Sequence, residues 1–411
     1  MKISWKKKNN LKPHVILDKI DSIKTVSSEG NVSFSGFELH DAMPVLKSMI
    51  SFPAQSDGLD KDALVWKTIS SIPEKLTPDV VINKINEIFR RQNAVRESAF
   101  HVLTSVSLNT LVLQKTITIE GARVRLLHVD FPKKYSARQD AIRNSKLTID
   151  ATPRNYCRVI IIVKAKSPHA AVTKALRCLD LQRALWCLFS NSRMEIIGNE
   201  WEPINTIRLG GIHTVHNENG SLATEMVWFE PNYSEAKLCD PKPPEIFNKN
   251  CIYARKLLSK STYSKSIKDA LLRYVRALDE KDQNNALVKL WGAIECLTAP
   301  GEANYDLVTK RCSFIFKDNI YHKQVLEHLR EVRNQSVHAG DQEEKAKINC
   351  YQLQFYFFNL IFFYLRSATA FESLDEANQF LSMSPNKDDL LKKKKLLARA
   401  LRFVSGKPSN K

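Results

Sequence analysis

Apolar residues recur at helical spacing through the second half of the chain. In segment 264–279 they fall on one face of a helix with about 3.6 residues per turn, and they are Ile267, Ala270, Leu271, Tyr274 and Leu278. We predict four further helices, over residues 283–297, 305–316, 321–339 and 343–371. No stretch of this part alternates as a half-buried strand does. The pattern therefore predicts a bundle of helices with short connections.

The first half of the chain mixes strand and helix patterns. Tyr156–Lys166, with Val-Ile-Ile-Ile-Val at its centre, is the clearest predicted strand, and Ser167-Pro168 then begins a helix over His169–Ser190. Segment 117–127 predicts a hairpin that turns at Glu120-Gly121. A second predicted hairpin joins 204–209 to 223–229 across Asn217–Gly220.

Earlier segments give weaker patterns. We predict helices over 60–69 and 79–93, the second beginning after Thr77-Pro78, where Pro suits the first helical position. Residues 32–39 alternate weakly and are interpreted as a strand. Residues 100–119 are rich in Val, Thr, Leu and Ile, and fit either strands or a buried helix and strand. The region 133–146 is interpreted as an exposed basic connection, with Lys133, Lys134, Tyr135, Arg138, Arg143 and Lys146.

A proline-rich segment marks the predicted boundary. Pro241-Lys242-Pro243-Pro244 has three prolines in four residues, which favours a stiff, extended connector. We therefore predict an α+β chain in three parts. Residues 1–240 form a mixed α/β region that regulates activity or recognises substrate, residues 241–375 form the helical bundle, and residues 376–411 form a basic tail.

The chain is strongly basic. Its 411 residues carry a formal net charge of +18, so the molecule as a whole attracts polyanions. Nucleic acid is the first candidate partner and an anionic membrane surface the second. Segment 385–411 holds nine Lys or Arg against two Asp, around Lys392, Lys393, Lys394 and Lys395. We leave two interpretations of this tail open, a solvated end and a basic amphipathic helix that contacts phosphates.

Cysteine spacing and hydropathy bear on the compartment. The eight cysteines are scattered singly, which argues against a zinc site and fits reduced cytoplasmic thiols. The first residues lack the apolar run of a signal peptide. The most apolar stretch, 355–365, is too short to span a bilayer and predicts a buried helix. We expect a cytoplasmic protein with no membrane partner.

The candidate chemistry lies late in the predicted helix 321–339. Arg333 and Asn334 are followed by three residues and then His338. An Arg fork can hold two phosphate oxygens, and a His titrates near neutral pH and can transfer protons. Residues five apart point about 140° away from each other on an ideal helix. Either the helix end distorts at Ala339-Gly340, or a second copy of the helix completes the site.

This motif resembles that of the HEPN ribonucleases, in which Arg precedes His by a few residues late in a helix. Residues 290–297 and 307–311 are similar to the Apea-like branch of that superfamily, and the resemblance covers roughly residues 263–371. It implies a homodimer in which two such motifs share one cleft and cleave RNA, leaving a 2′,3′-cyclic phosphate and a 5′-OH. In that scheme Arg333 and His338 are catalytic and Asn334 orients a phosphate or the His.

Other residues are assigned more broadly. Arg330, Lys310 and Arg311 are candidates for RNA binding, although a salt bridge from Lys310 or Arg311 to Glu295 and a solvated Arg330 are the alternatives. His213 and His216 are three apart on a predicted strand, so they face opposite sides, and no metal site is predicted. There is no phosphate-binding G-x-x-x-x-G-K-[ST] loop and no G-x-S-x-G elbow, and we expect no cofactor.

Three functions follow as hypotheses. The first is a metal-independent endoribonuclease that acts on RNA, with tRNA as one candidate, as a toxin or anti-phage defence effector. The second is a non-catalytic sensor of nucleic acid or nucleotide. The third is a structural subunit of a larger defence complex that needs a regulatory protein partner.

Overall fold

The computed structural model describes residues 2–8, 10–53, 59–109, 116–145, 153, 155–195, 202–301, 305–338 and 345–405, without the side chains of Tyr305 and His338. The described elements mix helices with strands, and the carboxyl-terminal part is helical. The chain is therefore an α+β protein.

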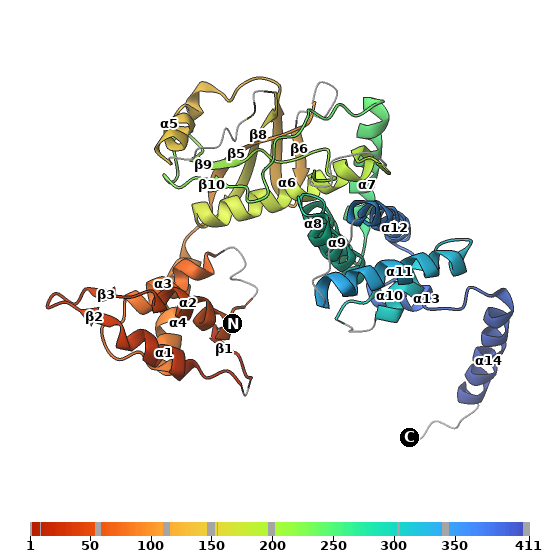
Figure 1. Ribbon diagram of the computed structural model, residues 1–411, viewed down its shortest axis with the longest axis horizontal. Coiled ribbons are helices and arrows are strands. Elements are labelled where there is room, and N and C mark those ends of the chain that lie inside the picture. The colour runs from red at the N-terminus through yellow and green to blue at the C-terminus, as the bar shows by residue number, and fades with distance from the viewer. Residues whose placement is uncertain are drawn as a thin grey trace.

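The first part of the chain is a small helical unit. Its helices are α1 (Pro13–Ser22), α2 (Glu38–Met49), α3 (Lys61–Ser70) and α4 (Pro78–Ala94). Two short antiparallel sheets accompany them, β1 (Ser4–Trp5) with β4 (Ile50–Ser51) and β2 (Lys24–Val26) with β3 (Val32–Phe34). Their apolar side chains form a buried cluster of their own, and Figure 1 shows this unit beside the rest of the molecule.

The amino end is held against α4 by a buried amide. The Asn86 Nδ2 donates to the Ile3 carbonyl at 2.8 Å, and the Ile3 N–H donates to the Asn86 Oδ1 at 2.9 Å. Both partners are buried, so neither backbone group of Ile3 is left unsatisfied. The first strand is thereby fixed to the last helix of the unit.

A six-stranded antiparallel sheet follows, with the strand order β10-β9-β5-β8-β7-β6. Its strands are β5 (Ser98–Val106), β6 (Thr116–Ile119), β7 (Ala122–Leu127), β8 (Cys157–Ala165), β9 (Ile212–Asn217) and β10 (Trp228–Phe229). Glu120 and Gly121 make the turn between β6 and β7 with positive φ angles, as a tight hairpin requires. The long pairing of β5 with β8 forms the centre of the sheet.

The two faces of the sheet have different covers. Because side chains alternate along a strand, Val102 and Val159 belong to one face, which packs against α6 (Pro168–Ser190). On the other face Leu103 and Ile160 pack with Tyr135 in a smaller cluster. That second cover consists of the turn η2 (Lys133–Tyr135) and α5 (Ala137–Asn144).

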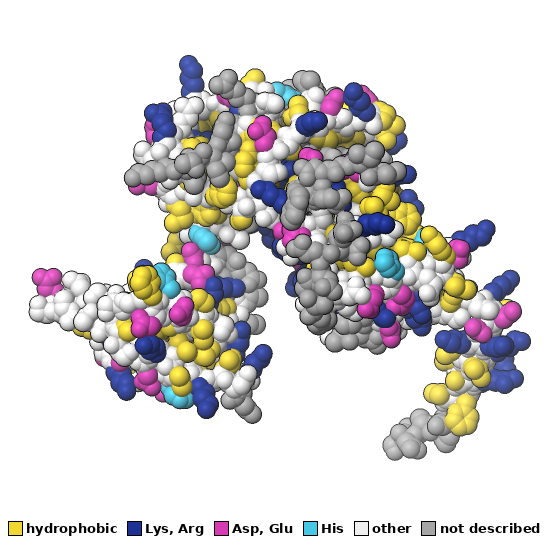
Figure 2. Space-filling view, in the orientation of Figure 1, with side chains coloured by type: hydrophobic (Ala, Val, Ile, Leu, Met, Phe, Trp, Pro, Cys, Tyr) yellow, Lys and Arg dark blue, Asp and Glu magenta, His cyan; other side chains and the backbone are white. Residues whose placement is uncertain are grey.

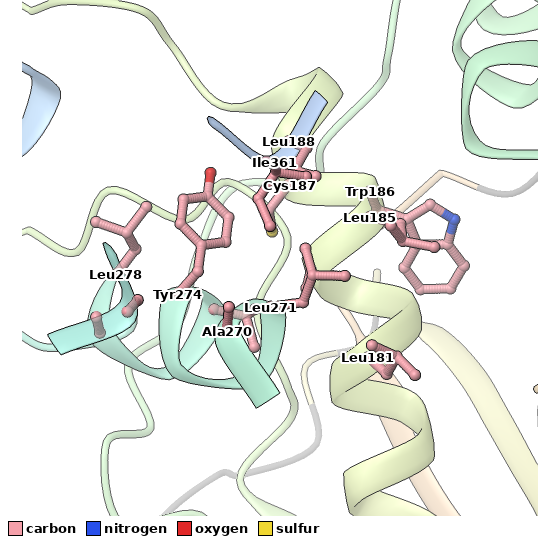
Figure 3. Close-up of a cluster of buried hydrophobic side chains, with 14 of the residues drawn as sticks. Leu181, Leu185, Trp186, Cys187, Leu188, Ala270, Leu271, Tyr274, Leu278 and Ile361 are labelled. Atoms are coloured by element: carbon pink, nitrogen blue, oxygen red, sulfur yellow. The ribbon is translucent and has the colours of Figure 1, made fainter. Parts of the chain in front are cut away.

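The helical part continues the buried cluster of the first sheet face. Its helices are α7 (Pro244–Lys260), α8 (Ser264–Ala277), α9 (Gln283–Thr298), α10 (Tyr305–Ser313), α11 (Asn319–His338), α12 (Ala346–Arg366), α13 (Leu374–Leu381) and α14 (Lys387–Ser405). Figure 3 shows Leu185 and Cys187 of α6 gathered with Leu271 and Tyr274 of α8, next to Ile361 of α12. The sheet and most of these helices therefore share one hydrophobic interior.

A network of buried charges lies where α6 meets α8. Arg183 is fully buried and donates to both carboxylate oxygens of Asp279, at 2.9 and 2.6 Å, and to Asp180 at 2.9 Å. Arg276 bonds Asp180 at 2.6 Å and Glu230 at 2.7 Å. Each guanidinium thus has two carboxylates, which compensates for the loss of hydration on burial.

Most helices predicted in the second half are confirmed, as are the helices over α3, α4 and α6 and the hairpin at Glu120-Gly121. Segment 100–119 contains two strands among its described residues. The predicted strand 204–209 is wrong, because the strand before the Asn217–Gly220 turn is β9. Residues 38 and 39 belong to α2 rather than to a strand. Helix α7 was not predicted, because the preceding prolines suggested a connector instead of a helix start.

The basic connection is a further correction. Tyr135 and Arg138 are buried at 3 % and 5 % exposure, whereas Lys134 and Arg143 are exposed and Lys146 lies outside the described residues. Burial follows from the strand face that this segment covers, which the local sequence does not reveal. The division of the chain near residue 240 stays a prediction, although the buried clusters separate at another point, between Phe89 and Phe100.

The charge network predicts an acid-sensitive contribution to stability. Burial opposes ionisation of Glu230, but His213 and Arg276 outweigh it and lower its pKa to about 2. A lowered folded pKa gives stability that is complete above the unfolded value of 4.5 and is lost as pH falls toward 2. We expect the advantage of wild type over Glu230→Gln in urea unfolding to shrink by about 1 kcal/mol between pH 6 and pH 3.5.

The matched control is Glu235→Gln, which alters an exposed carboxylate five residues away. Its stability difference from wild type should be the same at both pH values. A pH-independent effect of Glu230→Gln would contradict the assigned role of the Glu230 charge.

Candidate functional site

The residues of the Arg–His motif lie in the last turns of α11. Leu326, Leu329 and Val332 place one side of this helix in the hydrophobic interior. Arg333 and Asn334 follow Val332 and are half-buried. The helix is continuous from Asn319 to His338, so the whole motif has helical backbone geometry.

Arg333 and Asn334 contact each other directly. The Arg333 Nη1 donates to the Asn334 Oδ1 at 3.0 Å. This bond orients the guanidinium, whose planar fork has the geometry that phosphate oxygens require. Asn334 therefore has a positioning role toward Arg333.

The structure limits what one chain can do at this motif. Positions 333 and 338 stand about 140° apart around a regular helix axis, and α11 keeps its helical geometry through both. The distortion considered for Ala339-Gly340 lies outside the described residues. One regular helix places the two positions on different sides, so the described backbone does not bring them together.

Arg330 is engaged by acidic side chains. Its Nη2 lies 2.8 Å from a Glu327 oxygen, and its Nη1 pairs with Asp306 of α10. Glu327 also accepts a hydrogen bond from the Thr309 hydroxyl at 2.8 Å. These contacts fasten α10 to α11, which gives Arg330 a structural role in this state and opposes its proposed RNA contact.

Arg311 is a correction to the predicted RNA-binding set. It is buried at 8 % exposure, and its Nε donates to the Ser382 hydroxyl at 2.8 Å. Its Nη1 donates to the Thr298 carbonyl, which caps the end of α9. No described contact pairs it with Glu295 either. Lys310 on the same helix is exposed and remains open to a polyanion.

The four lysines 392–395 lie on α14, and no residue of this helix is buried. Figure 1 shows α14 projecting from the other helices, and Figure 2 shows its basic side chains next to apolar ones on the surface. The exposed apolar residues are Leu391, Leu396, Leu397, Leu401, Phe403 and Val404. The tail is thus an exposed helix with basic and apolar residues, which fits both interpretations, and its contact with phosphates stays a prediction.

The histidines of β9 face opposite sides of the sheet. The ring of His213 lies 2.8 Å from the Thr104 hydroxyl, whereas that of His216 lies 3.0 Å from both the Gly220 carbonyl and the Thr214 hydroxyl. Among the described residues, no group of three His, Cys, Asp or Glu side chains could hold a metal ion. Within the same residues, no helix has the length and apolar character needed to cross a membrane.

Several of the eight cysteines have raised thiol pKa values because they are buried. All eight lie in the described residues and none is in a disulfide. Burial raises the pKa of Cys178 and Cys296 to about 11, and that of Cys251 and Cys312 to about 12. A thiol is nucleophilic only as the thiolate, so these four stay inert at neutral pH.

The sequence analysis missed a second polar site under η2 and α5. Ser105, Arg138 and Arg158 line a cavity there of about 310 Å³. Arg158 is a charged residue in the largely apolar strand β8, and that exception to the strand pattern was the available signal. Arg138 carried no such signal, because it lies in a segment that resembled an exposed connection.

Comparisons with known proteins do not assign either site. No protein-family model matches this chain, and neither the curated proteins nor the solved structures yielded a significant match. The chemistry is therefore argued from the residues themselves.

Arg311 should be needed for stability rather than for RNA affinity. We expect Arg311→Ala to lower the free energy of unfolding by about 2–3 kcal/mol, because it removes two hydrogen bonds and leaves the Thr298 carbonyl buried without this donor. Urea unfolding measures the change.

Lys310→Ala is the matched control, since it removes a neighbouring exposed cation. Its effect on unfolding should stay within about 0.5 kcal/mol. If Arg311→Ala changed the free energy of unfolding as little as Lys310→Ala does but weakened RNA binding, Arg311 would be an RNA contact after all.

Proposed function

We propose that this chain is a metal-independent endoribonuclease of HEPN type that acts as a homodimer. One observation carries the proposal. The guanidinium of Arg333 is hydrogen-bonded to Asn334 in the last turns of α11, and the same continuous helix also contains His338. Metal-free cleavage of a ribose–phosphate link needs proton transfer and stabilisation of negative charge, which an imidazole and a guanidinium can supply.

In the proposed reaction the ribose 2′-oxygen attacks the adjacent phosphorus. The 2′-OH loses its proton to a base, the bond from phosphorus to the 5′-oxygen breaks, and His338 supplies a proton to that oxygen. Arg333 stabilises the additional negative charge with its planar fork. The products are a 2′,3′-cyclic phosphate and a 5′-OH, with no net oxidation or reduction.

A second copy resolves the orientation of the two positions. Two α11 helices that meet across a twofold axis can place Arg333 of one protomer near His338 of its partner. Val337 supports a contact in this region, because it lies one turn after Arg333 and is 45 % exposed. The bundle α8–α12 is the HEPN-like unit in this proposal. The mixed α/β region, residues 1–240, restrains activity or selects substrate.

The net charge of the chain supports an RNA substrate. Lys310 and the α14 lysines are exposed and can contact phosphates, independently of base sequence. Cleavage of cellular RNA by such a protein would stop growth, which is the basis for a role as toxin or anti-phage effector. One observation favours the alternative of a non-catalytic nucleic-acid sensor. Helix α14 projects from the other helices, and binding of nucleic acid to its lysines needs no nearby reaction centre.

Mutation of the motif tests the enzyme. Purified full-length protein should cut labelled RNA in the presence of EDTA, and Arg333→Ala or His338→Ala should each lower the rate by about 100-fold or more. His328→Ala changes an exposed histidine of the same helix and should retain wild-type activity. Mapping of the RNA ends should find cyclic phosphates. Tight binding without cut ends in the wild type would favour the sensor instead.

Mixing the two inactive variants tests the shared site. Subunit exchange between Arg333→Ala and His338→Ala protein produces mixed dimers that retain one intact Arg and one intact His. If these act across the dimer, activity should return to about a quarter of the wild-type value, because about half of the dimers are mixed and each mixed dimer has one of its two Arg–His pairs intact. If Arg333→Ala and His338→Ala each cleaved RNA on their own, the motif would be ruled out as the reaction centre.

A further inference from the structure

The cavity beneath η2 and α5 lies on the sheet face opposite α6. Ser105 of β5 and Arg158 of β8 are paired directly across the strands, so their side chains share that face. Arg138 enters from α5, while Lys133, Phe131 and Asp130 come from the segment before it. The cavity of about 310 Å³ is at the lower end of the range for small-molecule sites.

Arg138 is a buried cation held only by neutral acceptors. Its Nη1 donates to the Leu103 carbonyl at 3.2 Å and to the Thr214 hydroxyl at 2.6 Å, and its Nη2 donates to the Ile212 carbonyl at 3.0 Å. These bonds use three of the five N–H donors of a guanidinium. No carboxylate is paired with Arg138 among the described residues.

The contrast with Arg183 shows what is missing at Arg138. Both side chains are buried, but Arg183 is flanked by Asp180 and Asp279 and keeps a raised pKa in spite of its burial. Burial is the larger cause and the charge of Arg158 the smaller, and together they lower the pKa of Arg138 to about 9. The site of Arg138 therefore has an uncompensated positive potential.

Ser105 supplies an independent sign of a ligand. It is 2 % exposed, and its hydroxyl oxygen is buried with no hydrogen-bond partner. A buried hydroxyl normally has a partner, since an unsatisfied one costs about 1–3 kcal/mol. Ser105 lines the same cavity as Arg138 and Arg158, so a bound acceptor there can become the partner of its hydroxyl.

The remaining lining residues define the charge and size of the ligand. Arg158 donates to the Pro153 and Tyr156 carbonyls, and its distance to Asp130 is 3.6 Å, with Asp130 itself almost fully exposed. Lys133 adds another cation. With three basic residues and one acidic residue, the lining attracts an anion.

We propose that this cavity binds the phosphate group of a small phosphate monoester of mononucleotide size. The phosphate oxygens accept hydrogen bonds from Arg138, Arg158 and Ser105, since planar guanidinium forks match phosphate geometry. The Phe131 ring, 5.2 Å from the Arg138 guanidinium carbon, and Ile142 form an apolar wall for the organic part. This site is separate from Arg333 and does not depend on RNA cleavage.

Binding to the full-length protein tests this site. The probes are AMP, inorganic phosphate and adenosine, measured by calorimetry and by the shift in Tm. We expect AMP to bind and to raise Tm, inorganic phosphate to bind more weakly, and adenosine to have no effect. Ser105→Ala should weaken AMP binding about tenfold, the usual loss for one hydrogen bond to a charged group. Arg158→Gln should weaken it further.

Ser105→Ala is informative because it removes a hydroxyl that has no hydrogen-bond partner among the described residues. Its Tm without ligand should therefore equal or exceed that of wild type, so a loss of AMP affinity cannot come from unfolding. Ser261→Ala is the matched control, because Ser261 is also buried with an unpartnered hydroxyl but lies outside the cavity. It should bind AMP as wild type does.

Four results would overturn the proposal. One is the absence of AMP binding to wild type, and another is equal AMP affinity in wild type and Ser105→Ala. The third is adenosine binding as tightly as AMP, which would remove the phosphate from recognition. Equal affinity for inorganic phosphate and AMP would reject the monoester in favour of the free ion. Loss of RNA cleavage in Arg333→Ala has no bearing on any of these outcomes.

Discussion

Arg183 joins the parts of this protein that share its main interior. Its guanidinium binds Asp180 on its own helix, Asp279 after α8 and the carbonyl of Ile207 in the segment leading to β9. The desolvation of such a group is costly and is offset only when every donor is placed on an acceptor. The sheet, α6 and α8 must therefore adopt their positions together.

Two other buried arginines, Arg311 and Arg138, have different hydrogen-bond acceptors from those of Arg183. Arg311 caps the carboxyl end of α9, where a cation suits both the free carbonyl and the helix dipole. Arg138 has backbone and hydroxyl acceptors but no acid. Basic composition alone suggested a surface for polyanions, yet five Lys or Arg side chains of the described residues are buried, and Arg183, Arg311 and Arg138 among them make different contacts. The charge available to a nucleic acid is consequently concentrated on exposed elements such as α14.

Helical periodicity predicted much of the fold because it is a local property. Each of α8, α9 and α12 carries an apolar face that can be read from a few turns of sequence. Strand β8 was recognised from its run of branched residues, but β9 was displaced by several residues, since its hydrogen bonds to β5 connect segments more than a hundred residues apart. Long-range pairing also decides which basic residues are buried, so the burial of Arg138 and Arg311 was not predicted. At the candidate site, Arg333 and Asn334 could be identified from the sequence. The cavity around Ser105 could be identified only once the sheet was assembled.

The contact between Asn86 and Ile3 has a practical consequence for handling the protein. Both backbone groups of Ile3 are committed to a buried amide, so a purification tag joined immediately before it adds bulk beside the interior of the first helical unit. A fluorophore attached on the solvent side of α14 meets no buried side chain of that helix. Labels for spectroscopy are therefore better carried by the carboxyl-terminal helix than by the amino end.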